Sequence, residues 1–224
     1  MTPTALFIGS IGVLAETSDI QRRAYNQALE EAGLDWHWDA DTYRDLLTDS
    51  GGRKRLARLS EKTNANLSEH DIEKIHARKT ELACREITEG GITLRPGVAD
   101  LIKRALSQGL KLALVTTTYR ANIDAIATAA GEDLPLSKFS AVLTRDDCDE
   151  TKPAPDIYLS ALDRLGVESA SVMTIEDSAP SVHAAKQAGI YTIATPGEFT
   201  NQQDFSEADQ RLTSLDGIEL TIPG

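Results

Sequence analysis

The residues best suited to chemistry could hold phosphate and a divalent cation. Thr116 and Thr117 follow one short apolar run, Glu176 and Asp177 follow another, and Lys152 lies in a proline-rich loop between them. Hydroxyls at a strand–helix junction, backed by free N–H groups, can hold phosphate oxygens. A lysine adds a point charge for the same anion, and paired carboxylates suit Mg²⁺. The set is typical of a phosphoryl-transfer site.

Each of these groups alone also fits an ordinary structural role. A threonine after a strand more often caps the following helix, a lysine before proline is usually a solvated loop charge, and Glu-Asp-Ser is a common capping sequence. Their joint appearance, each near the end of an expected strand, favours a site because the carboxyl ends of parallel strands meet at one edge of a sheet.

The segments that must position these groups alternate between helix and strand from Arg95 onward. Short apolar runs, of the kind that is buried on both faces of a sheet, cover residues 112–115, 141–143, 172–175 and 191–194. The alternation predicts an α/β fold with a doubly wound parallel sheet and right-handed crossovers. The run 5–8 predicts a first strand, which delivers Gly9 and Ile11 to the same edge.

Residues 17–93 show helical patterns and no strand signal. The longest predicted helix covers 68–89, and Ser50-Gly51-Gly52 is expected to be a flexible joint. The sequence therefore predicts an all-helical cap over residues 17–93, inserted into an α/β core that is made of residues 1–16 and 94–224.

The composition is that of a globular protein, with 41% hydrophobic and 26% charged residues among 224. The formal net charge of −12 argues against nucleic-acid binding, although one small basic pocket is compatible with it. No apolar run approaches the ~20 residues of a membrane helix, and no signal peptide is evident, so we expect a cytoplasmic protein without membrane contact. The two cysteines are expected to be reduced, and the four histidines to be solvated or capping.

Over nearly its whole length the chain resembles the haloacid dehalogenase superfamily of phosphohydrolases. It is most similar to the branch with a helical cap after the first strand, which contains β-phosphoglucomutase and the CbbY-type sugar-bisphosphate phosphatases. The segments that carry the resemblance are Leu94-Arg95-Pro96-Gly97-Val98, Thr116-Thr117-Thr118, Lys152-Pro153-Ala154-Pro155-Asp156 and Glu176-Asp177-Ser178. The resemblance implies a Rossmannoid core with an inserted helical cap.

The family's first motif is Asp-x-Asp-Gly-Thr-Leu, and the matching positions here read Gly9-Ser10-Ile11-Gly12-Val13-Leu14. The resemblance implies that the first Asp is the nucleophile and an Mg²⁺ ligand and that the second is the acid/base. Gly9 and Ile11 remove these functions, which leaves Glu176 and Asp177 as a weakened metal site. Ser10 carries a hydroxyl, but it is expected to point away from positions 9 and 11.

The resemblance also implies residues that contact the substrate or the cap. Arg53 and Arg55 match positions that contact the distal substrate group in CbbY-type relatives. Glu16, just beyond the first motif, and Arg120, just after the threonine run, complete this set. A further departure is Ser181, because the fourth motif of the family usually carries Gly there.

Three functions are compatible with a chain that keeps the phosphate-binding groups and lacks the nucleophile. The first is an inactive or weak phosphatase-like protein that binds a phosphorylated metabolite or phosphate. The second is an Mg²⁺-dependent hydrolase of a small sugar phosphate, with Asp177 or Glu16 as the base for attack by water. The third is a structural role with an unidentified protein partner, in which Lys152 contacts Glu176 or Asp177 directly in place of the cation.

Overall fold

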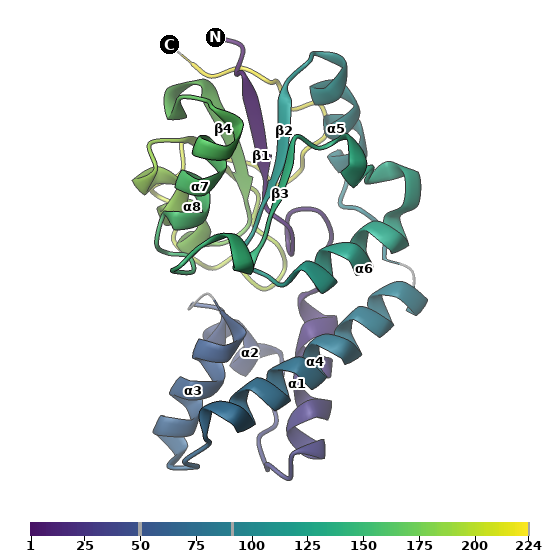
Figure 1. Cartoon of the computed structure of the whole chain (residues 1–224), viewed down its shortest axis with the longest axis vertical. Coiled ribbons are helices and arrows are strands. Elements are labelled where there is room, and N and C mark those ends of the chain that lie inside the picture. Colours follow the sequence, from purple (N-terminus) through teal and green to yellow (C-terminus); the bar gives the residue numbers. More distant parts are fainter. Residues whose placement is uncertain (49–50, 91, 224) are drawn as a thin grey trace.

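The computed structural model describes residues 1–48, 51–90 and 92–223. A parallel sheet with its flanking helices occupies one end of the molecule, and helices α1 to α4 occupy the other (Figure 1). The strands are β1 (Ala5–Ile8), β2 (Lys111–Val115), β3 (Ala141–Leu143), β4 (Val172–Glu176), β5 (Tyr191–Ala194) and β6 (Gln210–Arg211). The helices around the sheet are α5 (Val98–Ser107), α6 (Arg120–Ala130), α7 (Asp156–Leu165) and α8 (Ala179–Gln187).

The strand order β3-β2-β1-β4-β5-β6, with parallel pairing throughout, puts β1 at the centre of the sheet. The chain moves outward from β1 to β2 and β3 on one side and to β4, β5 and β6 on the other. This reversal of strand order creates a crevice at the carboxyl ends of β1, β2 and β4, where α/β proteins bind ligands. The predicted doubly wound parallel sheet is confirmed. β6 was not predicted, because its two residues are exposed and form no apolar run.

Alternate residues of the buried strands pack against different helical layers. Leu6 and Ile8 of β1 belong to a cluster with α5 and α6, and Ala5 and Phe7 belong to a cluster with α7 and α8. Because both faces are covered, the strands read as continuous apolar runs, which is the signal that located them in the sequence.

The helices at the other end are α1 (Ser18–Glu31), α2 (Ala40–Leu46), α3 (Gly52–Thr63) and α4 (Glu69–Gly90). They enclose a separate cluster rich in aromatic residues, among them Tyr25, Trp38 and Tyr43. Phe199, which lies beyond β5 in the sequence, also belongs to this cluster, and its ring centroid lies 5.8 Å from that of Tyr43. Among the residues with assigned structure, no helix is long and apolar enough to cross a membrane.

Two segments of the helical part, the start of α4 and the start of α3, bear on the sequence predictions. The long helix begins one residue after Ser68, whose hydroxyl accepts the N–H of Asp71 at 3.2 Å, as the capping pattern predicts. Of the expected joint Ser50-Gly51-Gly52, Ser50 lies outside the described residues, and Gly52 is the first residue of α3. Helix α3 was not predicted because its start carries three cations in place of an apolar stripe.

Candidate functional site

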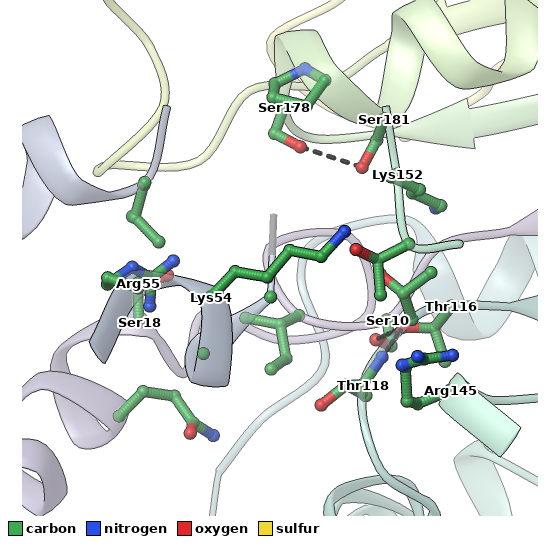
Figure 2. A pocket seen from close by; sticks show the side chains of 18 of the residues that line it. Ser10, Ser18, Lys54, Arg55, Thr116, Thr118, Arg145, Lys152, Ser178 and Ser181 are labelled. Carbon is green, nitrogen blue, oxygen red and sulfur yellow. Dashed lines mark hydrogen bonds between the residues drawn. The ribbon is translucent and has the colours of Figure 1, made fainter. Parts of the chain in front are cut away.

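A cavity of about 420 Å³ lies between the helical end and the carboxyl edge of the sheet. From the sheet side it is lined by the segments after β1, β2, β3 and β4, and from the helical side by α1, α2, α3 and α4. Figure 2 shows Lys54 and Arg55 on the helical side and Ser10, Thr116, Thr118 and Arg145 on the sheet side. Residues that lie far apart in the sequence therefore face one chamber.

The structure brings most of the predicted site residues to this cavity. Those that line it are Ile11, Arg53, Arg55, Thr116, Thr117, Lys152, Glu176 and Asp177. Glu16 and Arg120 are not part of the lining within the described chain. The Glu16 carboxylate accepts the N–H of Glu198 at 3.1 Å, and the exposed Arg120 donates to Asp124 at 2.8 Å on its own helix. Placing these two at the ligand is therefore not supported by the geometry.

Lys152 and Glu176 form a buried ion pair at the floor of the cavity. The Lys152 ammonium donates to Glu176 Oε1 at 2.6 Å, and the two side chains are 4% and 2% exposed. The Tyr158 hydroxyl donates to the same carboxylate oxygen, and burial beside Glu176 raises the pKa of Tyr158 well above its usual value. The direct contact between Lys152 and a carboxylate, predicted from the sequence, is confirmed.

The Glu176 carboxylate also lies over Gly9. A Cβ atom at position 9 would come within 2.7 Å of Glu176 Oε2 and 2.9 Å of Val13 Cγ2. Both distances are shorter than van der Waals contact, so a side chain at position 9 requires Glu176 to move. The space that an aspartate would need is filled by the carboxylate of a neighbouring strand.

Asp177 lies beside this pair and is half-buried in the cavity wall. Burial, followed by repulsion from Glu176 and Glu16, raises the pKa of Asp177 to about 8. In the free protein the carboxyl group is therefore largely protonated at neutral pH. Its side chain lies directly against Gly12, which has a φ of +78°.

Replacing Gly12 by alanine is expected to destabilise the fold more than the same change at Gly33. Both glycines have positive φ, +78° and +73°, so each alanine carries about 1–2 kcal/mol of backbone strain. A Cβ at Gly12 would also clash with Asp177, whereas the space around Gly33 is open, and overpacking adds about 1–3 kcal/mol. Urea denaturation measures both losses, and equal losses would contradict the close approach of Asp177.

Ser10 faces the cavity, contrary to the expectation from strand alternation. Its hydroxyl lies 2.7 Å from that of Thr116, and both side chains are buried. The alternation fails because β1 ends at Ile8. The Ser10 carbonyl accepts the N–H groups of Val13 and Leu14, at 3.2 and 2.8 Å, so this segment is a turn rather than a strand.

The helical wall contributes two buried residues that sequence analysis missed as site residues, Lys79 and His76 of α4. Burial, and then repulsion by Arg55, lowers the pKa of Lys79 to about 7, and its ammonium lies 4.7 Å from the centre of the Tyr25 ring. Burial lowers the pKa of His76 to about 3, so the expectation of solvated or capping histidines is wrong here. The sequence did contain a signal for Lys79: it lies seven positions after Ile72, on the apolar face of the same helix, where a charged residue is unusual.

Several buried polar atoms of the lining lack a hydrogen-bond partner among the described residues. They are Gln21 Oε1, Tyr25 Oη and Thr151 Oγ1. No carboxylate within the described ranges pairs with Lys79 either. Buried polar groups are normally satisfied, and each exception calls for a water or a ligand as partner. The cavity therefore suits a polar ligand that can hydrogen-bond to these atoms.

Known proteins with similar sequences belong to a family of hydrolases. The family described as haloacid dehalogenase-like hydrolase matches residues 8–189. The protein CbbY of Rhodobacter capsulatus is 40% identical over 94% of this chain and 93% of its own length. A CbbY protein from Cupriavidus necator is 40% identical over 91% of this chain and 82% of its length.

Solved structures of CbbY proteins have the same fold as this chain. CbbY from Rhodobacter sphaeroides in complex with phosphate superposes with a TM-score of 0.88 at 38% identity, over 95% of each chain. An Asp-to-Asn mutant of the same protein, in complex with xylulose-(1,5)-bisphosphate, gives the same values. β-Phosphoglucomutase from Clostridium difficile shares the fold, with a TM-score of 0.80 at 20% identity over 97% of this chain and 93% of that one. The chain belongs to the haloacid dehalogenase-like hydrolase family and is of the CbbY type.

Proposed function

We propose that the cavity binds a small sugar phosphate, with residues 17–93 acting as a cap over a core of residues 1–16 and 94–224. The observation that carries this proposal is the charge of the lining. Its cations outnumber its two carboxylates, Glu176 and Asp177, and they are Arg53, Lys54, Arg55, Lys79, Arg145 and Lys152. This excess of positive charge sits in a chain whose net charge is −12, so it is a local feature that suits an anion.

The cations fall into two groups, which supports a ligand with anionic groups at both ends. Arg53, Lys54, Arg55 and Lys79 belong to α3 and α4, whereas Arg145 and Lys152 lie between β3 and α7. Figure 2 labels Lys54 and Arg55 of the first group and both members of the second. The N-termini of α6 and α3 also meet the cavity, and unpaired N–H groups at a helix start favour anions. The CbbY relatives that hold phosphate or xylulose-(1,5)-bisphosphate support the same class of ligand.

We further propose that this chain hydrolyses its ligand poorly. Gly9 and Ile11 provide no carboxylate, and loss of a covalent nucleophile costs on the order of 10⁶ in rate where it has been measured. That factor corresponds to about 8 kcal/mol of activation free energy. Thr116 and the cations keep the means to position phosphate, and they do not replace a nucleophile.

A second candidate function is hydrolysis by a rearranged site. It is favoured by membership of a hydrolase family, whose members generally use Mg²⁺, and by the carboxyl group of Asp177 in the cavity wall. A screen of phosphate esters with Mg²⁺ decides between the two. Turnover that is abolished in Asp177→Ala supports hydrolysis, and a flat screen removes it.

Calorimetric titration with xylulose-(1,5)-bisphosphate tests the binding proposal. Binding is expected for the wild-type chain and for Lys103→Met, because Lys103 is exposed and pairs with Asp133 outside the cavity. Lys79→Met is expected to bind at least tenfold more weakly, because it removes the buried cation of the helical wall. No heat at millimolar ligand, with or without Mg²⁺, would refute the proposal.

Ligand binding is expected to weaken as the pH rises above 7. Lys79 has a lowered pKa of about 7 in the free protein, so it is increasingly neutral above that pH. An anion beside it favours the charged form, and binding must therefore take up a proton. Affinity is expected to fall by up to about tenfold per pH unit between pH 7 and 9. Titrations in buffers of different ionisation enthalpy measure the uptake, which should be smaller in Lys79→Met, where the proton held by Asp177, with a pKa of about 8, remains.

A further inference from the structure

Among the described residues, the carboxylates of the cavity that could bind Mg²⁺ are Glu176 and Asp177. Within the described ranges, no group of three or more His, Cys, Asp or Glu side chains could hold a metal ion. Of the two carboxylates in the cavity, Glu176 already accepts both Lys152 and Tyr158 through Oε1. Mg²⁺ prefers near-ideal octahedral oxygen ligation, and the residues present do not fit it.

The sheet side of the cavity carries no excess of negative charge without a metal. Glu176 is neutralised by its ion pair with Lys152, Asp177 is largely protonated at neutral pH, and Arg145 also lines the cavity. The Arg145 guanidinium donates to the backbone carbonyls of Cys148 and Asp149, which fixes its position without using a carboxylate. A divalent cation is therefore not required to offset repulsion between the protein and an incoming phosphate.

The Ser10–Thr116 hydroxyl pair supplies a hydrogen-bond donor in the same place. The two hydroxyls are joined by one contact of 2.7 Å, and Thr116 Oγ1 also accepts the N–H of Thr118 at 3.2 Å. The hydrogen bond between the two hydroxyl groups uses the proton of one of them. The proton of the second hydroxyl has no acceptor within the described part of the chain. Both side chains line the cavity. A phosphate oxygen would complete this arrangement.

We propose that the sheet side of the cavity binds a phosphate monoester without Mg²⁺, and that the Ser10–Thr116 hydroxyl pair is a donor to it. This inference rests on the proposed function, since it specifies how the sugar phosphate is held. Two changes in the loop after β1 act together in this account. Gly9 and Ile11 remove carboxylates that would repel the anion, and Ser10 adds a neutral donor next to them.

The test is calorimetry with inorganic phosphate and with xylulose-(1,5)-bisphosphate, in Mg²⁺ and in EDTA. The dissociation constants with and without Mg²⁺ are expected to agree within about twofold. Ser10→Ala is expected to weaken binding about tenfold in EDTA, the effect of losing one hydrogen bond to a charged group. The matched control is Ser171→Ala, which removes a similar hydroxyl pair with Thr4, 2.8 Å long and exposed at the other end of the sheet. Thr116→Val, of nearly the same shape, repeats the loss if Ser10→Ala is unstable.

The outcomes separate the two proposals. Binding that appears only with Mg²⁺ overturns metal-independent binding and leaves the proposed function standing. No binding of either anion under any condition overturns the proposed function itself. Metal-independent binding that is unchanged in both Ser10→Ala and Thr116→Val overturns the role of the hydroxyl pair.

Discussion

The double variant Gly9→Asp/Ile11→Asp is expected to release phosphate from sugar phosphates in the presence of Mg²⁺, where the wild-type chain does so slowly or not at all. The new aspartate at position 9 must displace the Glu176 carboxylate, because a Cβ atom at position 9 would lie 2.7 Å from Glu176 Oε2. The aspartate at position 9 then adds an oxygen ligand for Mg²⁺ beside Glu176, and the aspartate at position 11 supplies the acid/base group. The gain has an upper limit on the order of 10⁶ in turnover, the cost of losing a nucleophile.

The matched control for this experiment is Gly9→Asn/Ile11→Asn. It imposes the same crowding against Glu176 and Val13, which lowers stability by about 1–3 kcal/mol, but it provides neither nucleophile nor charge. Phosphate release is measured for both variants with and without Mg²⁺. If the aspartate pair is as inactive as the asparagine pair, the remaining phosphate-binding groups are not arranged for transfer.

Lys152→Met is expected to lower the free energy of unfolding by about 3–5 kcal/mol, because removing one partner leaves a buried charge uncompensated. Its partner Glu176 is 2% exposed, and within the described residues its side chain keeps only the hydroxyl of Tyr158 as a hydrogen-bond partner. The methionine retains the length and apolar stem of the lysine, so little of the loss arises from packing.

Lys54→Met is the control for that measurement. Lys54 pairs with Glu150 at 2.9 Å, and the two side chains are 58% and 66% exposed. Exposed pairs contribute about 0–1 kcal/mol. Urea unfolding at pH 7 gives both values. Losses of similar size for the two variants would mean that Glu176 finds another partner or becomes protonated when Lys152 is removed.

The strands and core helices could be predicted because burial on both faces leaves a direct record in the sequence. The runs at 141–143 and 191–194 coincide with β3 and β5. Phosphate-binding candidates could be found for the same reason, since the ends of such strands share one edge. Glu176 differs slightly, because it is the last residue of β4 rather than the first after it.

The helical wall of the site could not be predicted in the same way. Whether Lys79 is solvated or buried depends on how α4 packs against α1 and α6, and helical periodicity alone does not give that packing. The orientation of Ser10 depends on a turn that begins two residues earlier than strand alternation assumed. The occupation of the space over Gly9 depends on the rotamer of a residue from another strand, which local sequence does not encode.

The position of Phe199 has a consequence for how firmly the helical end is held to the core chain. Its ring belongs to the core chain beyond β5 but is 3% exposed among the aromatic residues of the helical end, with the Arg44 guanidinium 5.7 Å from its centre. Movement of α2 away from the sheet must first withdraw this ring, at a cost of about 1.5–3 kcal/mol for a fully buried phenylalanine. Phe199 therefore stabilises the packing of the helical end against the core chain by an amount of this order.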